Sequence, residues 1–223
     1  MFAGLNEEAF AAYAQEKWSS NVHNLARMQV KSQLESLAGL VAQETGEALG
    51  LLERSASDEI PNITNQKKVD AQWLYWFRNA QERQELKSLL KENTLSSPSF
   101  FNIASQDKHA IIAFVLRHDS LWVGLRLASA AMVDRQNLSA KLGKTWEREG
   151  FVTLLKELTE HFEMGFGDQT QPLSGVDAQY VDGLAGQLMD SKESWHIGQR
   201  LTKDDVIAMG DSLHNPLAEI FQQ

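Results

Sequence analysis

The sequence predicts an α+β fold: an N-terminal helical region packed on a C-terminal layer of helices over a small antiparallel sheet built around one β-hairpin. Three observations predict it. Helical patterns follow one another without alternating regularly with strands, which argues against a doubly wound parallel sheet or a barrel of strands and helices. Two short apolar runs, residues 110–116 and 121–127, are separated by polar residues, as in a hairpin. Hydrophobic residues make up 43% and charged residues 23% of the chain, as in ordinary globular domains.

With 223 residues, the chain has the length of one or two domains. We expect a helical region over residues 1–96 and an α+β region over residues 97–223, joined through the polar stretch 93–99. A single compact domain over residues 1–223 is the alternative, because this stretch is short enough to be an internal loop.

The first 50 residues are predicted to be helical. Asn6 has the position of an N-cap, and Glu7 and Glu8 follow it at the positive end of the helix dipole. A longer helix follows Ser20, with apolar residues at mostly helical spacing. Glycine disfavours helix, so we expect this second helix to break near Gly46.

Residues 55–66 have the composition of a surface loop, and residues 65–92 are predicted to form a helix because Val69, Trp73 and Trp76 have helical spacing. Five consecutive bulky residues begin at Trp73 and would cover this helix on all sides, so something must bury its second face. We expect packing within this chain. The alternative is a contact surface for a partner or ligand, made of Trp73, Tyr75, Trp76 and Phe77.

The two strands of the predicted hairpin differ in how many of their faces are buried. Residues 110–116 are apolar on both faces, as in an interior strand. In residues 121–127 apolar side chains alternate with Trp122, Gly124 and Arg126, which indicates a strand with one buried face. Trp122 and Arg126 share the less apolar face, where a cation or a base would be able to stack.

The rest of the chain returns mainly to helix. Ser174 with Asp177 and Thr202 with Asp205 both have the spacing of a capping box. The predicted elements are helices over 130–142 and 150–162, a turn-like stretch over 166–175, a helix after Ser174, a short strand over 195–201, and helices after Thr202 and Asn215.

The net charge is −9, and residues 107–148 are the basic exception, with seven Lys and Arg against four Asp and Glu. Binding to duplex nucleic acid depends on many phosphate contacts by Lys and Arg, so this acidic chain is a poor candidate for it. Single-stranded nucleic acid, bound by aromatic stacking on the basic segment, is one alternative function.

The chain has no cysteine, which excludes a disulfide-linked partner and thiolate metal sites. Its longest purely apolar run, residues 110–116, is far shorter than the roughly 20 residues that cross a bilayer, so we expect no membrane partner. The first residues lack the basic and apolar regions of a secretory signal. We therefore expect a cytoplasmic protein.

Motifs with a defined chemistry are missing from the sequence. None of the 14 glycines lies in a phosphate-binding loop, and no nucleophile elbow or zinc-protease helix occurs. No two of the six histidines lie within four residues of each other, so no metal site is predicted from one helical turn. The sequence predicts no particular cofactor.

A hydrolase or nuclease is nevertheless a second function class. Arg117, His118 and Asp119 lie together at the predicted hairpin turn and offer a donor fork, a group that titrates near neutrality and a carboxylate. The simpler interpretation is that the turn is polar because it is exposed to solvent. The candidate acid/base residues are His118, Asp119, Asp134 and His196.

Candidate ligand-binding residues surround these groups. Arginine and asparagine near the start of the helix after the hairpin would be able to hold an anion, although a capped helix start explains them as well. Strand alternation predicts that one of Trp195 and His196 faces the core. The candidates are Arg117, Trp122, Arg126, Arg135, Asn137 and Trp195.

The missing catalytic motifs and the surplus of aromatic residues favour a third class over both. We expect a non-catalytic protein-interaction or regulatory module, whose partner is another protein or a second copy of the chain. Its contact surface would be either the aromatic run that begins at Trp73 or the strand face that carries Trp122.

Overall fold

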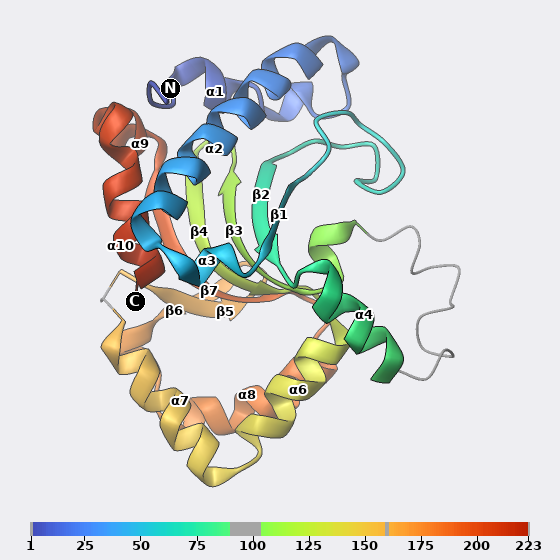
Figure 1. Ribbon diagram of the computed structural model, residues 1–223, viewed down its shortest axis with the longest axis vertical. Helices are drawn as coiled ribbons and strands as arrows, with labels where there is room; N and C mark the ends of the chain where they lie inside the picture. The colour runs from blue at the N-terminus through green and yellow to red at the C-terminus, as the bar shows by residue number, and fades with distance from the viewer. Residues whose placement is uncertain (1, 90–103, 159–160, 223) are drawn as a thin grey trace.

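The computed structural model describes residues 2–89, 104–158 and 161–222. Within these residues, one open sheet of seven antiparallel strands is flanked by helices (Figure 1). The mixture of helices and antiparallel sheet is therefore confirmed. The sheet is larger than the small one expected, although the predicted hairpin does lie at its centre.

The strands follow the order β1-β2-β3-β4-β7-β5-β6 across the sheet. Their bounds are β1 (Glu53–Ala56), β2 (Gln72–Phe77), β3 (Ala110–Leu116), β4 (Ser120–Leu127), β5 (Glu163–Phe166), β6 (Gln169–Pro172) and β7 (Trp195–Thr202). The α-helices are α1 (Glu7–Ala11), α2 (Asn24–Thr45), α3 (Glu47–Gly50), α4 (Ala80–Leu89), α6 (Met132–Leu142), α7 (Thr145–Glu157), α8 (Ala178–Asp190), α9 (Lys203–Met209) and α10 (His214–Gln222).

Side-chain caps begin three of these helices. Asn6 and Thr202 are at predicted positions, whereas the cap of α8 is Asp177 and not the predicted Ser174, which lies in the short turn Leu173–Gly175. Asn6, Asp177 and Thr202 each accept a hydrogen bond from a backbone N–H in the first turn of α1, α8 and α9. The long helix α2 ends where the break is predicted, and Gly46 follows it with a φ of 66°. A positive φ costs glycine little, which explains why the helix can end there.

Most elements after residue 110 agree with the sequence pattern. The hairpin of β3 and β4 is confirmed, as are the helix α6, the helix α8 and the strand β7. The helix predicted over 150–162 begins and ends about one turn earlier, as α7. The last helix begins at His214, next to the predicted cap Asn215.

The helix predicted over 65–92 is wrong. Residues 72–77 form the strand β2, and helix begins only at Ala80. Side chains of a strand point alternately to its two faces, so Trp76 enters one core while Tyr75 enters another. A uniformly bulky run has no period of its own, and aromatic residues fit a strand that is covered on both faces.

Three short strands lie outside the predicted elements. The strands β1, β5 and β6 have four residues each and stand at or beside the two edges of the sheet. Such short runs contain too few residues for alternation to be recognised. The stretch predicted as turn-like, 166–175, thus contains β6, and the stretch predicted as loop, 55–66, begins with the end of β1.

The proposed boundary between residues 96 and 97, and the linker over 93–99, lie outside the described residues and stay a prediction. The sheet contains strands from both sides of this boundary, because β2 pairs with β3. The two predicted regions therefore share one sheet.

Helices cover one face of the sheet, which we call the covered face. Leu74, Phe114 and Val123 on this face pack in a core with α1, α2, α9 and α10. Farther along, Leu127 and Trp195 pack in a second core with α6, α7 and α8. In Figure 1, α1 lies above the strands and α9 and α10 lie to their left, while α6, α7 and α8 lie below them.

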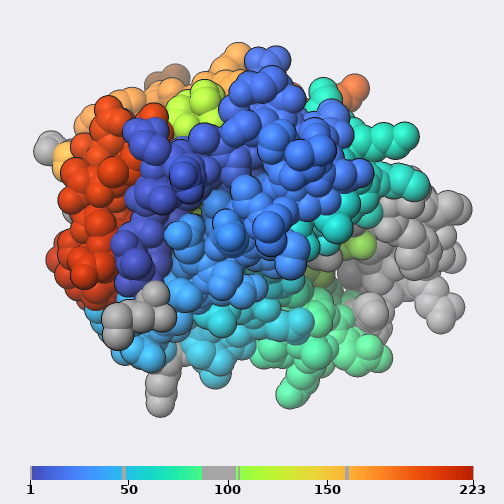
Figure 2. Space-filling model, turned by 90° about the horizontal axis from the view of Figure 1, so that it is seen from above, coloured from blue at the N-terminus to red at the C-terminus, as the bar shows by residue number. Residues whose placement is uncertain are grey.

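The two ends of the chain meet over the first core. Seen from above in Figure 2, the N-terminal residues lie against the C-terminal helices. The Lys203 ammonium is 2.9 Å from the Glu7 carboxylate, which joins α9 to α1. The helix α10 packs on α2, and Phe10 of α1 lies in the same core as Leu217 of α10, so the first and last helices close one core.

The opposite face, which we call the open face, carries a smaller cluster of buried side chains around Ile111, Ala113 and Trp122. One end of this face is covered by α4 and by His109, the residue before β3. The Arg83 guanidinium and the His109 ring both lie against the Phe77 ring there. The other described helices pack on the covered face. The centre of the open face is hollowed.

Candidate functional site: a groove on the open sheet face

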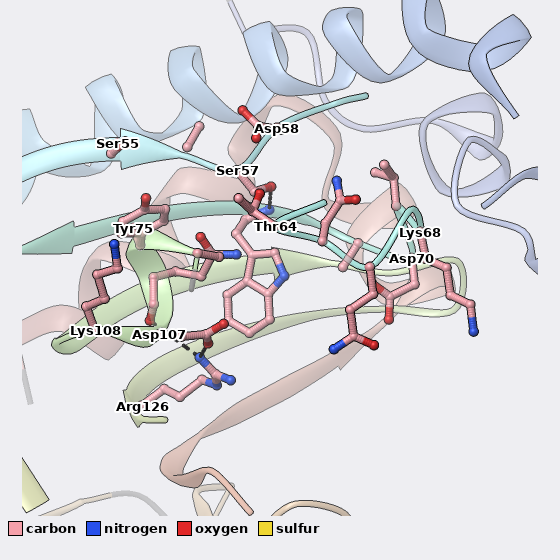
Figure 3. Close-up of a pocket in the computed structure, with 18 residues that line it drawn as sticks. Ser55, Ser57, Asp58, Thr64, Lys68, Asp70, Tyr75, Asp107, Lys108 and Arg126 are labelled. Atoms are coloured by element: carbon pink, nitrogen blue, oxygen red, sulfur yellow. Dashed lines mark hydrogen bonds and ion pairs between the residues drawn. The ribbon is translucent and has the colours of Figure 1, made fainter. Parts of the chain in front are cut away.

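Two hollows lie side by side on the open face. One, of about 620 Å³, lies between the loop over residues 57–70 and the segment 104–108, and we call it the loop hollow (Figure 3). The other, of about 810 Å³, lies over the middle strands, and we call it the sheet hollow. Asp70, Trp73 and Arg126 line both hollows. We call the two hollows together the groove.

Strand register places the floor of the sheet hollow. Val115 of β3 lies opposite Trp122 of β4, which in turn lies opposite Arg200 of β7. Four residues after Trp122 along β4, Arg126 lies opposite His196 of β7. Because side chains two residues apart share a face, these five residues come together on the open face from three neighbouring strands.

The Trp122 indole lies flat on two glycines. A Cβ atom at Gly124 would be 2.9 Å from Cζ2 of Trp122, and one at Gly198 would be 2.7 Å from the same atom. Such distances leave no room for any side chain beneath the ring. The indole also meets the His196 ring edge-on, with 5.7 Å between the ring centroids. Trp122 is only 7% exposed, and its Nε1 has no hydrogen-bond partner in the described part of the chain.

Arg126 and Trp73 form the wall between the two hollows. The guanidinium carbon lies 4.8 Å from the centre of the Trp73 ring, a cation–π contact. Nη1 is 2.7 Å from Asp107 Oδ1, as Figure 3 shows, and Nη2 donates to Ser194 Oγ at 2.7 Å. Three elements therefore hold this arginine in one orientation.

The loop hollow has a polar and preformed lining. The Trp73 backbone N–H donates to Ser57 Oγ at 3.0 Å, and the Ser57 N–H donates to the Trp73 carbonyl at 2.9 Å, which fixes the loop to β2. Asn62 then donates to Asp58 at 2.6 Å and accepts from the Thr64 N–H. In Figure 3 Asp58 and Thr64 lie on the loop side of the hollow, with Asp107 and Lys108 on the far side.

The hairpin turn forms one end of the sheet hollow. Arg117 is 3.5 Å from Asp70, and both side chains are nearly half exposed. His118 Nδ1 is 3.8 Å from Asp119 Oδ1, which is beyond hydrogen-bond distance, and both are mostly exposed. Burial raises the pKa of Asp119, but the hydrogen bond from Ser120 and the nearby positive groups outweigh it, so this pKa is lowered.

Arg200 and His196 line the same hollow along β7. Nε of Arg200 is 3.8 Å from Glu163, and Nη1 donates a long hydrogen bond of 3.4 Å to Ser120 Oγ. The pKa of His196 is lowered mainly by burial, and Arg126 and Arg200 lower it further against the opposing effect of Glu163. His196 is therefore mainly neutral at pH 7.

The charges that line the groove nearly balance. The sheet hollow is lined by three arginines, two histidines and four carboxylates, and the loop hollow by three cations and three carboxylates. The carboxylates of the sheet hollow are those of Asp70, Asp119, Asp168 and Glu193. The groove is thus polar and aromatic without a strong field of one sign.

The structure brings together six of the residues singled out in the sequence as catalytic or ligand-binding candidates. They all line the sheet hollow, together with Trp73 from the predicted contact surface: Arg117, His118, Asp119, Trp122, Arg126 and His196. Alternation in β7 places His196 in the hollow and Trp195 in the second core, so one of the two faces the core as expected, but the ligand-binding candidate Trp195 lies away from the groove.

Asp134 and Arg135 are buried in the framework instead. Asp134 accepts from the Ala110 N–H at 2.6 Å and forms an ion pair with Arg78, so it fixes α6 to the start of β3. Arg135 donates to the Ser191 carbonyl at 2.7 Å and to the carbonyl of Glu193. Neither side chain lines the groove, so the geometry of the groove does not support a direct contact of either residue with a ligand there.

Three further candidates also lie away from the groove. Asn137 is exposed on α6 and lines neither hollow. Trp76 is buried in the first core against Phe114 and Phe221, at centroid distances of 5.2 Å and 5.5 Å. Phe77 is buried at the end covered by α4, so of the aromatic run only Trp73 and Tyr75 reach a described hollow.

Several groove residues were missed in the sequence. Asp70 and Ser194 lie in loops and Asp107 ends a short 3-10 helix, and only the folded chain brings them to Arg126 and Arg117. Arg200 had a signal, because it shares the open face with His196 in the strand that the sequence does predict.

No group of three or more side chains suited to a metal ion occurs in residues 2–89, 104–158 and 161–222. No helix in these same ranges is long and apolar enough to cross a bilayer. Neither a protein-family model nor a curated protein matches the sequence, so the function is argued from geometry alone.

Proposed function

We propose that the protein is a non-catalytic interaction module that binds an extended segment of a partner protein in the groove. The observation that carries this proposal is the meeting of three tryptophans, Trp18, Trp73 and Trp122, with three arginines around one hollow of the sheet face. Tryptophan and arginine contribute most to binding at protein interfaces, especially in hollows from which water is displaced. Shallow grooves of this volume are also the usual place for ligands.

The balance of charge favours a polypeptide as the ligand. A peptide presents both signs of charge together with backbone donors and acceptors, and the groove offers partners for each of them. A nucleic acid strand presents one negative charge per nucleotide and requires a basic path. The carboxylates of Asp70, Asp119, Asp168 and Glu193 would repel it, which makes single-stranded nucleic acid the weaker proposal.

The hydrolase or nuclease alternative has less support. A general base must reach its proton at roughly 3 Å. Within the described residues of the sheet hollow, the closest imidazole and carboxylate are those of His118 and Asp119, at 3.8 Å and mostly exposed to water. His196 is the buried imidazole, and it packs on Trp122. This alternative therefore ranks second.

A selection from a displayed library of random linear peptides tests the proposal. Enriched peptides would be labelled, and their binding measured by fluorescence anisotropy with the wild-type protein, with Trp73→Leu and Arg126→Gln, and with Arg54→Gln as the control. Arg54 is an exposed arginine of β1 that lines neither hollow. The expected result is a loss of about tenfold or more in affinity for each groove variant and no change for the control.

Two results would contradict the proposal. One is a selection without enriched peptides at any protein concentration tested. The other is enriched peptides that bind both groove variants as tightly as the wild type. Thermal unfolding of each variant would show that a lost affinity comes from the groove and not from a lost fold. Sedimentation across a range of concentrations would show whether the bound partner is a second copy of the chain.

A further inference from the structure

We propose that the hairpin end of the sheet hollow is a carboxylate-binding subsite, which takes an Asp or Glu side chain from an extended segment lying in the groove. The subsite consists of the Arg117 and Arg200 guanidinium groups, which line the sheet hollow together with Trp122. This inference rests on the proposed function and specifies the chemistry of its ligand.

The position of the two arginines follows from strand register. Arg117 comes two residues after Val115, so the two side chains share the open face, and Val115 is opposite Trp122. On the other side of Trp122 lies Arg200. Neighbouring strands are about 4.8 Å apart, so the long side chains of Arg117, one residue past the end of β3, and of Arg200 in β7 both extend over the hairpin end of the sheet hollow.

Both arginines are incompletely paired. Arg117 is 3.5 Å from Asp70 and 43% exposed, and Arg200 is 3.8 Å from Glu163 and 49% exposed. A well-formed arginine–carboxylate contact is about 2.7–2.9 Å long and often uses both nitrogens of the fork. Arg126, at 2.7 Å from Asp107 and 17% exposed, meets that standard. Arg117 and Arg200 therefore keep donors that a ligand carboxylate is able to use.

A third donor points to the same ligand. Trp122 is more than nine-tenths buried, and its Nε1 has no partner in the described part of the chain. A buried N–H without an acceptor is unfavourable, and buried polar groups in proteins are almost always paired. The Nε1 atom is itself buried, so a ligand oxygen reaches this donor only when the indole shifts toward the hollow.

The local electrostatic field supports this assignment. The pKa of His196 is lowered first by burial and then by the positive charges of Arg126 and Arg200. The pKa of Asp119 is lowered although burial opposes it, with contributions from His118 and Arg200. The protein's own carboxylates at this end, Asp70, Asp119 and Glu163, face the same arginines, and we expect a ligand carboxylate to compete with them.

The opposite end of the sheet hollow carries acidic side chains. The strand β7 runs from that end toward the hairpin turn, and Glu193 precedes it. Asp168 lies close by, in the turn between β5 and β6, which is held by the hydrogen bond from the Gly167 N–H to the Ser194 carbonyl. Neither carboxylate has an ion-pair partner in the described part of the chain. An acidic group would therefore be repelled at this end and attracted at the other, which sets the direction of the ligand.

The occupant is expected to be a side chain within a segment and not a chain end or a free anion. The sheet hollow continues into the loop hollow past Trp73 and Arg126, which line both. A ligand held at the hairpin end can thus continue along the groove and contact both hollows. A small anion would contact the arginines alone.

Two peptide libraries with blocked ends test this subsite. They are identical except that the central residue is Glu in one and Gln in the other, so the comparison isolates one carboxylate. Binding of each library to the full chain would be measured by competition in fluorescence anisotropy. The expected result is a preference of about tenfold or more for the Glu library, as for a bidentate arginine contact.

Variants of the two arginines locate the preference. Arg117→Gln and Arg200→Gln are each expected to reduce the preference for Glu to nearly onefold, while Arg54→Gln keeps it. Arg200→Lys retains the charge without the planar fork, so it should keep part of the preference, whereas a purely structural role for Arg200 would leave the ratio of the two libraries unchanged. Because these side chains are nearly half exposed, we expect the variants to fold, which thermal unfolding would check.

The possible failures are distinguishable. If both libraries bind equally, the carboxylate subsite is overturned and the proposed function stands. If neither library binds, and no peptide is enriched in the selection, the proposed function fails as well. Acetate that competes as strongly as the Glu library would overturn the side chain as occupant. An oligodeoxythymidine that binds more tightly than either library, with a steep dependence on salt, would replace the peptide by single-stranded nucleic acid.

Discussion

The covered face and the open face of the sheet are made from the same strands but carry different side chains. In β4, Leu121 and Val123 are fully buried against helices, while the alternate residues Trp122 and Arg126 line the groove. The covered face is apolar and closed by two cores, and the open face combines rings with charged groups. Because successive side chains of a strand point to opposite faces, one strand contributes to folding stability through one face and to binding through the other.

This comparison predicts that substitutions on the two faces have different consequences. On the covered face they should reduce stability and leave the affinity of the folded protein unchanged. On the open face they should reduce affinity with a smaller effect on stability. The predictions below test each half of this statement.

The largest expected effect is that of Phe114→Ala on the covered face. Phe114 is fully buried and contacts the rings of Trp76 and Phe221, so the substitution leaves a cavity in the first core. We expect the free energy of unfolding to fall by about 3–5 kcal/mol, measured by chemical denaturation. Leu154→Ala, on the exposed side of α7, is the control and should change it by less than about 0.5 kcal/mol. Equal effects at the two positions would contradict the assignment of the core.

Gly198→Ala is expected to have an intermediate effect, because it disturbs both the strand pairing and the open face. The added methyl group would overlap the Trp122 indole, which lies 2.7 Å away, as well as the backbone of β4. Overpacking of this kind costs about 1–3 kcal/mol, and displacement of the indole should also weaken peptide binding. Denaturation and anisotropy would measure the two effects.

Gly39→Ala provides the matched control for this substitution. Gly39 lies inside α2, with nothing within 4 Å of an added Cβ, and alanine favours helix over glycine by about 1 kcal/mol. This variant should therefore be slightly more stable than the wild type. If Gly198→Ala behaved in the same way, the close approach of Trp122 to β7 would be wrong.

The smallest predicted effect concerns the dependence of stability on pH. His196 has a folded pKa below its ordinary value of 6.5, mainly because it is buried, so below that value the unfolded chain binds more protons than the folded one. Stability is therefore complete above pH 6.5 and is lost as the pH falls through the folded pKa. His196→Gln should remove part of this loss in denaturation curves recorded from neutral to acidic pH.

His109 sharpens this prediction, because burial also lowers its pKa while it stacks on Phe77 at the covered end of the open face. His109→Gln should remove a separate part of the pH dependence, and the two parts should add because the two rings do not touch the same residues. A curve for His196→Gln that coincides with the wild-type curve would contradict the burial of His196 in the groove.

Local sequence patterns predicted much of the fold. The caps at Asn6 and Thr202 and the break at Gly46 depend on residues a few positions apart, and all three are present, while the cap of α8 is Asp177 and not the predicted Ser174. The strand β2 could not be predicted in this way, because a run without polar residues shows neither the helical nor the strand period. Its pairing with β1 and β3 depends on distant residues.

The candidate site likewise has features that local sequence patterns predict and features that depend on distant residues. Alternation in β4 predicted that Trp122 and Arg126 share a face, and the hairpin turn predicted that Arg117, His118 and Asp119 lie together. The partners that fix Arg126, which are Asp107, Ser194 and Trp73, come from three distant segments, and no spacing in the sequence relates them. The charge balance of the groove could be seen only after folding.

The central claim is that the open face, and not another surface, receives the partner. The most direct measurement is the perturbation of backbone amide signals by NMR when an enriched peptide is added to the labelled protein. We predict that the largest changes lie at Trp122, Arg126 and His196. The contradicting result would be changes centred on α7, where Trp146 is 70% exposed, with the amides of β4 and β7 unaffected.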